Sequence, residues 1–387
     1  HLMAETFYAT SFDFQHVLSF RRGTIPVEDL DKALAFVTNT VSQGTRLQPI
    51  TFTSAKQLVP VANRPVLFYG IDAMASAGIK EIGIIIAPET GDEIREMVGS
   101  GEQFGVNVTF IEQDEPAGLA HAVLTAEEFL GADPFVMYLG DNLLQGGISD
   151  LVEAFRSSSP DALILLTPVS DPENYGVAEL DGDRVISLQE KPPEPKTNLA
   201  LVGVYMFTAG IHDAARAIKP SARGELEITD AIQYLVDDGK RVEPHVVQGW
   251  WKDTGRLEDM LEANRLVLDT AERRLDGELI DSTCEGRVIV EAGAVLERST
   301  VRGPAVIGAG ARLIDAYVGP YSAIGERCVV ERAEVENSIL LEGSSVTDLN
   351  ARVESSLLGR DVTIARSEGQ PSAYRFLVGD RSDIGVV

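Results

Sequence analysis

The stretch Gly44-Thr45-Arg46-Leu47-Gln48-Pro49 sets a cation between a glycine and a proline, and Ser54-Ala55-Lys56-Gln57-Leu58 soon adds a second cation. An apolar run at residues 32–37 precedes both and fits a first β-strand. Open α/β sheets bind phosphate groups in the loops that follow their strands, where backbone N–H groups and nearby cations face the anion. We therefore expect this part of the chain to bind a phosphorylated ligand.

The composition narrows the classes of partner. The chain has 387 residues, enough for two domains, and a formal net charge of -27. A surface this acidic repels polyanions, so neither nucleic acid nor a membrane is an expected partner. No apolar run nears the roughly 18 residues of a membrane span, and the signal-peptide pattern is absent, so we expect a cytoplasmic protein. Cys284 and Cys328 have no metal-ligand spacing and are expected to be buried thiols.

Short apolar runs alternate with amphipathic stretches from residue 32 to about residue 249. Three of the runs, at 82–86, 135–139 and 162–166, are continuous, as is typical of strands covered on both faces by helices. Residues 65–77 fit one of the intervening helices, and residues 257–275 fit a longer connecting helix. This alternation predicts βαβ units and a mostly parallel sheet.

The periodicity changes near residue 280. Aliphatic residues recur there in steps of six, with small residues and glycines between them, at Ile289, Val295, Val301, Ile307 and Leu313. The spacing resumes after slips at Val318, Leu340 and Leu358. A period of six predicts a left-handed parallel β-helix, in which each coil stacks its aliphatic side chains on those of the next coil.

Further motifs follow the opening stretch in a fixed order. They are Gln113 with Gly118-Leu119-Ala120, Leu139-Gly140-Asp141-Asn142, Tyr175-Gly176-Val177, Glu190-Lys191-Pro192, Gly224-Glu225-Leu226-Glu227-Ile228-Thr229-Asp230 and Trp251-Lys252-Asp253-Thr254-Gly255. Together they resemble the sugar-1-phosphate nucleotidyltransferases, above all the long-form glucose-1-phosphate thymidylyltransferases, from about residue 32 to the C-terminus. The resemblance implies an enzyme that joins a sugar 1-phosphate, expected to be glucose 1-phosphate, to a nucleoside triphosphate, expected to be dTTP, and releases pyrophosphate.

The predicted fold is α/β, with a mostly parallel Rossmann-like nucleotidyltransferase sheet followed by a C-terminal left-handed parallel β-helix. Four segments are expected: an extension of unassigned role at 4–31, a catalytic domain at 32–256, a linker helix at 257–279 and the β-helix at 280–387. The resemblance also implies a homo-oligomer and a Mg²⁺ cofactor.

The resemblance carries over roles to matching residues. Nucleotidyl transfer depends on positioning and charge stabilisation, so cations and metal-binding carboxylates dominate the expected site. The expected catalytic residues are Arg46, Lys56, Asp141 and Asp253, of which Asp141 and Asp253 would hold the Mg²⁺. The expected nucleotide-binding residues are Gly44, Thr45, Gln57, Gln113 and Gly118. The expected sugar-phosphate-binding residues are Gly176, Glu190, Lys191, Leu201 and Glu227, with Glu227 the weaker candidate.

One departure from the family pattern concerns the loop ahead of Gly44. The family has a pair of glycines there, whereas this chain has Thr38-Asn39-Thr40-Val41-Ser42-Gln43. Val41 is β-branched and disfavours the positive φ that such a phosphate loop needs. An alternative hypothesis is therefore a homologue that has lost nucleotidyl transfer and binds, or acts differently on, a phosphorylated sugar-like or other phosphorylated substrate.

Two smaller alternatives concern histidines. An acyltransferase activity in the β-helix would need a histidine as general base, and no histidine follows His245, so assembly or regulation is the favoured role of that domain. His121 lies close to the Gly118 motif in sequence. It either lines the nucleotide pocket or is an ordinary packed or solvent-facing imidazole.

Overall fold

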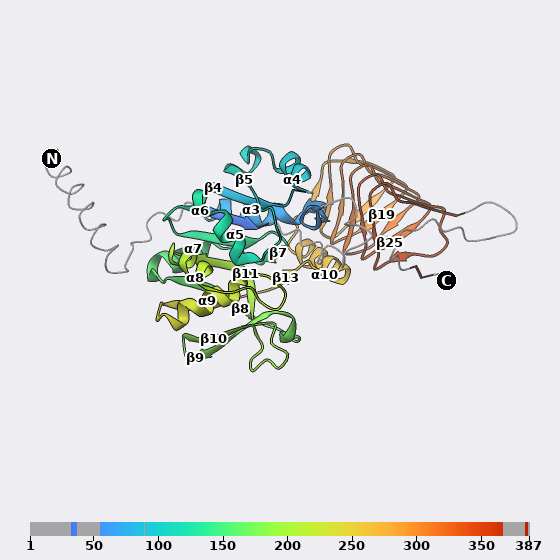
Figure 1. The fold of residues 1–387 in the computed structure, drawn as a ribbon. Helices are drawn as coiled ribbons and strands as arrows, with labels where there is room; N and C mark the ends of the chain where they lie inside the picture. The colour runs from blue at the N-terminus through green and yellow to red at the C-terminus, as the bar shows by residue number, and fades with distance from the viewer. Residues whose placement is uncertain (1–31, 37–54, 89, 367–383, 386–387) are drawn as a thin grey trace, which may run out of the picture. The chain divides into compact units, whose positions relative to one another are not determined.

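The computed structural model describes residues 32–36, 55–88, 90–366 and 384–385, and these residues form two compact units (Figure 1). The first unit contains residues 32–36, Gly70–Leu139 and Leu144–Trp251, and the second contains residues 55–69, Gly140–Leu143 and the chain from Lys252 onward. The extension at 4–31, the altered loop at 38–43 and the stretch with Gly44, Thr45 and Arg46 lie outside the described residues.

The first unit is built on a sheet that has nine strands among the described residues, and their order is β10-β9-β11-β6-β1-β4-β5, with β8 beside β11 and β12 beside β8. The strands are β1 (Lys32–Phe36), β4 (Glu81–Ile86), β5 (Asn107–Glu112), β6 (Phe135–Leu139), β8 (Ala162–Pro168), β9 (Gly176–Asp181), β10 (Arg184–Glu190), β11 (Leu199–Phe207) and β12 (Val242–Val246). Strands β5, β4, β1 and β6 run parallel to one another. Strand β11 runs antiparallel to β6, β8 and β9. The Rossmann-like part is thus present, and the antiparallel part is an addition that periodicity did not predict.

Helices account for the amphipathic stretches between these strands. They are α3 (Val66–Ser76), α4 (Gly91–Val98), α5 (Leu119–Thr125), α6 (Glu127–Leu130), α7 (Ser149–Ser158), α8 (Gly210–Ala217), α9 (Ile228–Asp237) and α10 (Leu257–Leu268). No helix in the described part of the chain is long and apolar enough to cross a membrane.

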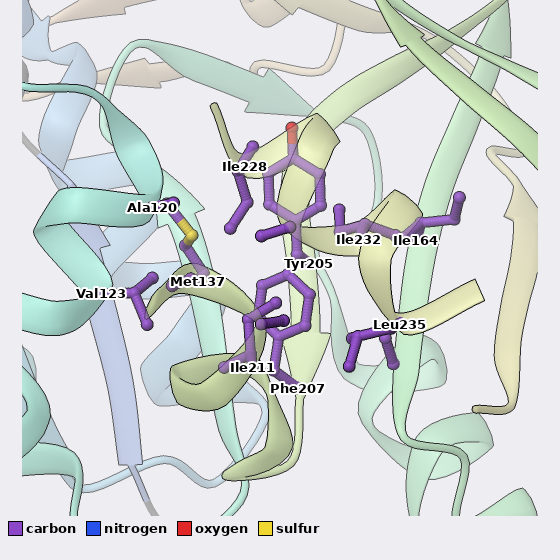
Figure 2. Packing of buried hydrophobic residues seen from close by; sticks show 14 of the residues in the cluster. Ala120, Val123, Met137, Ile164, Tyr205, Phe207, Ile211, Ile228, Ile232 and Leu235 are labelled. Carbon is purple, nitrogen blue, oxygen red and sulfur yellow. The ribbon is translucent and has the colours of Figure 1, made fainter. Parts of the chain in front are cut away.

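The core of the first unit lies around β11 (Figure 2). The rings of Tyr205 and Phe207 are stacked, with centroids 5.8 Å apart and 12° between their planes. Ile228, Ile232 and Leu235 of α9 recur at helical spacing and pack as one apolar face against this pair. The same helix carries Glu227 and Thr229 at its N-terminal end, so the packing of α9 fixes a part of the candidate site.

The second unit contains a parallel β-solenoid with three sheets (Figure 1). The first sheet contains β14 (Arg274–Leu275), β17 (Val288–Val290), β20 (Ala305–Ile307), β23 (Ser322–Ile324), β26 (Ile339–Leu340) and β29 (Leu357–Leu358). The second contains β15 (Glu278–Ile280), β18 (Val295–Glu297), β21 (Arg312–Ile314), β24 (Val329–Glu331), β27 (Ser345–Thr347) and β30 (Thr363–Ala365). The third contains β16 (Thr283–Glu285), β19 (Thr300–Arg302), β22 (Tyr317–Val318), β25 (Glu334–Glu336) and β28 (Val353–Glu354). The predicted parallel β-helix is therefore confirmed.

The length of one coil differs from the eighteen residues that three steps of six predict. Neighbouring coils pair mostly at an offset of seventeen residues, as Thr283, Thr300 and Tyr317 do, because one side of each coil is a residue shorter than the other two. Val301, Ile307 and Leu313 point inward and are fully buried, as predicted. Ile289 and Val295 do not: their neighbours Val290 and Leu296 fill the core instead. The predicted inward positions in the first coils were therefore wrong by one residue, because uninterrupted steps of six do not allow for the shorter side of the coil.

The connecting helix is also shorter than predicted. The expected helix over 257–275 ends at Leu268. Arg274 and Leu275 instead form β14 and pair in parallel with Ile289 and Val290 of the next coil. Pairing with the solenoid therefore overrides the helical spacing of Leu275.

One corner of the solenoid carries a ladder of alternating charge. Asp281, Arg298, Asp315, Arg332 and Asp348 occupy equivalent positions in successive coils, all with φ between 47° and 57°. The Arg298 guanidinium binds both carboxylate oxygens of Asp315 at 2.7 and 2.8 Å, and Arg332 binds Asp348 in the same way at 2.5 and 2.9 Å. These pairs are exposed and each adds little stability. Opposite charges on neighbouring coils favour their stacking, whereas like charges at this corner would repel each other.

A hairpin within the second unit is attached directly to the solenoid. Strands β2 (Pro60–Val61) and β3 (Arg64–Pro65) are joined by Ala62 and Asn63, whose φ values of 48° and 62° are typical of a two-residue hairpin turn. Asn63 Nδ2 donates to the Ile324 carbonyl at 2.7 Å. The fully buried Asn264 of α10 accepts a hydrogen bond from Ala62 N at 2.9 Å and donates to the Tyr321 carbonyl at 2.8 Å. The hairpin, α10 and the solenoid therefore form one hydrogen-bonded assembly.

Candidate active site

A buried cluster in the second unit brings together three of the predicted catalytic residues. Lys56 begins the short helix η3 (Lys56–Leu58) and is only 5% exposed. Its ammonium forms an ion pair with Asp141 Oδ2. Asp141 follows β6, and Asp253 ends β13 (Trp251–Asp253). Gln57, predicted to assist at the base, is fully buried in the same turn as Lys56.

Thr254 explains why the two aspartates meet. Its backbone N–H and its hydroxyl both donate to the carbonyl oxygen of Asp141, at 3.0 and 2.9 Å. The Asn142 amide donates to Asp141 Oδ1 at 2.8 Å and fixes the plane of that carboxylate. The two motifs are 113 residues apart in sequence at this bond. Neither Thr254 nor Asn142 was predicted as a site residue, although both lie inside the motifs quoted above.

The two carboxyl groups of the cluster differ in pKa. Burial alone would raise the pKa of Asp141, but the Lys56 ammonium and hydrogen bonds hold it below its ordinary value. Burial raises the pKa of Asp253 to about 7, and the negative charge of Asp141 adds to this effect. One carboxyl group is thus stably ionised, while the other loses its proton only near neutral pH.

The donor set suits a hard divalent cation. Asp253 Oδ1 is buried and has no hydrogen-bond partner in the described part of the chain. Mg²⁺ is commonly held by one or two carboxylates, and substrate phosphates and water complete its shell. No group of three His, Cys, Asp or Glu side chains in the described residues is arranged to hold a metal. The orphaned Asp253 oxygen beside an ionised Asp141 fits that ion.

A second cluster, in the first unit, contains the residues predicted to bind the base. Gln113 follows β5 and is 8% exposed. Its amide nitrogen lies 2.8 Å from His121 Nδ1 and 3.4 Å from the Gly118 carbonyl oxygen. Gly118 has φ +101°, and a Cβ there would lie 2.5 Å from the Leu226 carbonyl oxygen. Glycine is therefore required at 118, and the backbone it approaches so closely is that of the Gly224–Asp230 motif.

A third cluster, also in the first unit, contains four of the five residues predicted to bind the sugar phosphate. Glu190 Oε2 accepts a hydrogen bond from the Thr229 hydroxyl at 2.7 Å. A Cβ on Gly176 would meet the side chains of Leu201 and Thr229 at 2.8 Å and Glu190 Oε2 at 3.1 Å. Glu227, the weaker candidate, joins the cluster: it is 5% exposed.

Arg223 links the carboxylates of this third cluster. Its Nη2 donates to Glu190 Oε1 at 3.0 Å and to Glu227 Oε1 at 2.9 Å. Ser221 donates to the same oxygen of Glu227 at 2.7 Å. Lys191 is exposed, with its ammonium 3.5 Å from Glu190 Oε1. Arg223, Ser221 and Thr229 were not predicted as site residues: only Thr229 lies within a quoted motif, and no spacing signal marks the other two.

The arrangement suits recognition of a hydroxyl-rich ligand. Glu190, Glu227 and the nearby Asp230 present acceptor oxygens, and burial followed by the charges of the two glutamates raises the pKa of Asp230. Carboxylates accept hydrogen bonds from sugar hydroxyls, while Arg223 and Lys191 keep the local charge from becoming strongly negative.

Comparison with known proteins identifies the class to which these clusters belong. Residues 42–270 match the family described as nucleotidyl transferase. The chain therefore belongs to the nucleotidyl transferase family, and the resemblance drawn from its motifs is confirmed. The chain is 54% identical over 346 residues to a glucose-1-phosphate thymidylyltransferase of Streptomyces antibioticus. The alignment covers 89% of this chain and 97% of that protein. The chain is 45% identical over 346 residues to the low-salt glycan biosynthesis nucleotidyltransferase Agl11 of Haloferax volcanii, over 88% of this chain and 97% of that one.

Solved structures agree with the family. A Bacillus anthracis chain assigned as a glucose-1-phosphate thymidylyltransferase, crystallised with sucrose, superposes with a TM-score of 0.58 at 35% identity. The match covers 63% of this chain and 97% of that one. A UDP-glucose pyrophosphorylase crystallised with UDP-glucose shares the fold, with a TM-score of 0.55 at 23% identity, over 62% of this chain and 99% of that one.

Proposed function

We propose that this enzyme condenses glucose 1-phosphate with dTTP to give dTDP-glucose and pyrophosphate. The observation that carries the proposal is the buried cluster of Lys56, Asp141 and Asp253, in which Asp253 Oδ1 has no hydrogen-bond partner among the residues that the structure describes. The proposed substrates come from the relatives, because the relative that is 54% identical over nearly its whole length is a glucose-1-phosphate thymidylyltransferase.

The chemistry is a displacement at phosphorus. An oxygen of the sugar phosphate attacks the α-phosphorus of the nucleotide, a new P–O bond forms, and the bond from the α-phosphorus to the oxygen that bridges to the β-phosphate breaks. Pyrophosphate leaves with the electron pair of that bond. The protein therefore has to bring two anions together and stabilise the charge on the transferred group.

The catalytic cluster supplies that stabilisation. Asp141 and Asp253 would hold Mg²⁺, which neutralises phosphate charge when bound. Lys56 would contact the α-phosphate or the sugar-phosphate oxygens as a point charge. Arg46, with Gly44 and Thr45, is proposed to contact the triphosphate on the strength of its motif.

The other two clusters bind the ends of the two substrates. Gln113 and Gly118 are proposed to contact the base, with Gln57 assisting. Glu190, Gly176, Leu201 and Glu227 are proposed to bind the sugar, and Lys191 its phosphate. The close packing of Gly176 against Glu190 and Leu201 supports a pocket shaped to the sugar ring.

The division of labour in the chain is also a proposal. Residues 32–256 would carry the catalysis, and the solenoid from about residue 280 would serve assembly into a homo-oligomer. Removal of the chain beyond Asp281, followed by measurement of molecular mass in solution, tests the assembly role, because an unchanged oligomer would exclude it. The reaction would take place in the cytoplasm, where nucleoside triphosphates are made.

A pyrophosphate-release assay with dTTP, glucose 1-phosphate and Mg²⁺ tests the function. We expect steady turnover by the wild-type chain and a loss of about 10²-fold or more in kcat for Lys56→Met. Lys80→Met is the matched control, because Lys80 is an exposed lysine, and it should turn over like the wild type. A folded protein that binds glucose 1-phosphate but releases no pyrophosphate from any nucleoside triphosphate would overturn the proposal and favour a homologue that has lost nucleotidyl transfer.

A further inference from the structure

The amide of Gln113 has one orientation in the structure. Its nitrogen lies 2.8 Å from His121 Nδ1 and 3.4 Å from the Gly118 carbonyl oxygen, so both N–H groups have acceptors. The amide oxygen, Oε1, has no hydrogen-bond partner among the described residues. An amide nitrogen can only donate, so this contact is a hydrogen bond in the His121 tautomer that leaves Nδ1 as the acceptor.

His121 is itself held in place by its helix. Ala120 and Ala122, on either side of it in α5, are fully buried. Ala120 N donates to the Leu226 carbonyl at 3.0 Å, which anchors the first turn of the helix. The Thr125 hydroxyl donates to the carbonyl of His121 at 3.0 Å. These contacts fix the backbone that carries the half-buried imidazole, and the Gln113 amide is the ring's partner at 2.8 Å.

This orientation has a consequence for base recognition. With both N–H groups engaged, Gln113 can offer a ligand only an acceptor, Oε1. Thymine and uracil carry an N–H donor at N3, whereas cytosine carries an acceptor at that position. Two acceptors facing each other leave both unpaired, and sites built around a hydrogen bond reject analogues that lack the donor.

We propose that His121 is a positioning residue for base selection: it fixes the Gln113 amide so that Oε1 accepts the N3–H of thymine or uracil, and cytosine is rejected. This proposal rests on the proposed function for its nucleotide substrate. It differs from a packing role, because a residue that merely fills space would leave the choice between thymine and cytosine unchanged when replaced by a ring of similar size.

The test compares His121→Phe, which keeps an aromatic ring but removes the acceptor, with His121→Gln, which restores an acceptor. Binding of dTTP and dCTP is measured by calorimetry, and kcat/KM is measured for both nucleotides at saturating glucose 1-phosphate. We expect the preference of His121→Phe for dTTP over dCTP to fall by about 10-fold or more, because the freed amide can rotate and present its N–H groups to cytosine. In kinetics the loss for dTTP should lie in KM rather than kcat, and His121→Gln should recover most of the preference.

Unchanged selectivity in a folded His121→Phe variant would overturn the proposal. His121→Ala, which places no new bulk in the helix, gives the same comparison if the phenylalanine variant does not fold. The binding measurement separates the two hypotheses: a chain that discriminates dTTP from dCTP through His121 without turnover loses the proposed function and keeps this inference. A chain that turns over with a selectivity independent of His121 keeps the proposed function and overturns this inference. A chain that binds neither nucleotide overturns both the proposed function and this inference.

Discussion

Thr254 binds the backbone of Asp141 twice, through its N–H at 3.0 Å and its hydroxyl at 2.9 Å. Both partners are buried, with Thr254 only 1% exposed. The bonds fix the end of β13 against the turn after β6 and so set the separation of the Asp141 and Asp253 carboxyl groups. In the proposed function these two carboxylates hold the cation, so we expect this pair of bonds to affect activity.

Thr254→Val should therefore lower activity more than stability. Valine has nearly the same shape but no hydroxyl, so Asp141 keeps only the backbone bond, at a cost of about 1 kcal/mol in the free energy of unfolding. We expect kcat to fall by about 10-fold and the Mg²⁺ concentration for half-maximal rate to rise, measured by pyrophosphate release. Thr254→Ser keeps the hydroxyl and should stay close to wild type. Equal losses in both variants would show that the hydroxyl bond has no such role.

Asp253→Asn should abolish turnover and yet stabilise the metal-free fold at alkaline pH. The pKa of Asp253 is raised to about 7 from 3.8, so the folded chain keeps a proton that the unfolded chain loses between these values. The stability contributed by protonated Asp253 is complete below the unfolded pKa and is lost as pH rises through 7. At pH 8 the asparagine variant should be more stable by about 2–4 kcal/mol, and the gap should narrow at pH 5.

Denaturant unfolding in the presence of a chelator gives these free energies. Addition of Mg²⁺ at pH 8 should stabilise the wild type, because a cation favours the ionised carboxylate, and should have a smaller effect on Asp253→Asn. A variant that is no more stable than wild type at pH 8 would contradict the raised pKa.

Gly176→Ala should weaken sugar-phosphate binding. The added methyl would lie 2.8 Å from the side chains of Leu201 and Thr229, which is closer than real contacts allow, so Glu190 and its partner Thr229 must move. We expect KM for glucose 1-phosphate to rise by about 10-fold or more, while KM for dTTP changes little. Gly182→Ala is a useful reference, because a Cβ there has nothing within 4 Å, although its φ of +60° adds some strain. A parallel rise in both KM values would argue against a local effect.

The motifs named residues that the structure brings together, while their roles at the site stay predictions. Asp141 with Lys56, and Glu190 with Gly176, Leu201 and Glu227, lie in segments that are far apart in the chain, yet the structure brings each set together. Their partners were harder to predict. Arg223 is an exposed arginine in a polar loop, and its double contact with two glutamates depends on where α9 packs, which no local pattern encodes.

In the fold, too, some features were predicted from local sequence and others were not. Continuous apolar runs predicted β4, β6 and β8, because burial on both faces leaves that mark on composition. The antiparallel direction of β11 leaves no such mark, since a buried strand has the same apolar run in either direction. The coil length of seventeen residues was missed because the inward register shifts by one residue at the shorter side, and aliphatic neighbours such as Ile289 and Val290 mask that shift.

Asn264 gives the last prediction, because it couples the hairpin that follows Lys56 to the solenoid. Its side chain is fully buried, accepting from Ala62 N and donating to the Tyr321 carbonyl. Asn264→Ala leaves both groups unpaired and should lower the free energy of unfolding by about 2–4 kcal/mol. We also expect kcat to fall, since the Lys56 turn leads directly into this hairpin. Asn63→Gly is the matched control: it removes only the bond to Ile324, and glycine tolerates the φ of 62° at that position. Its losses of stability and of kcat should both be smaller. An Asn264→Ala protein that is destabilised but has wild-type kcat below its melting temperature would show that the solenoid supports the hairpin without positioning Lys56.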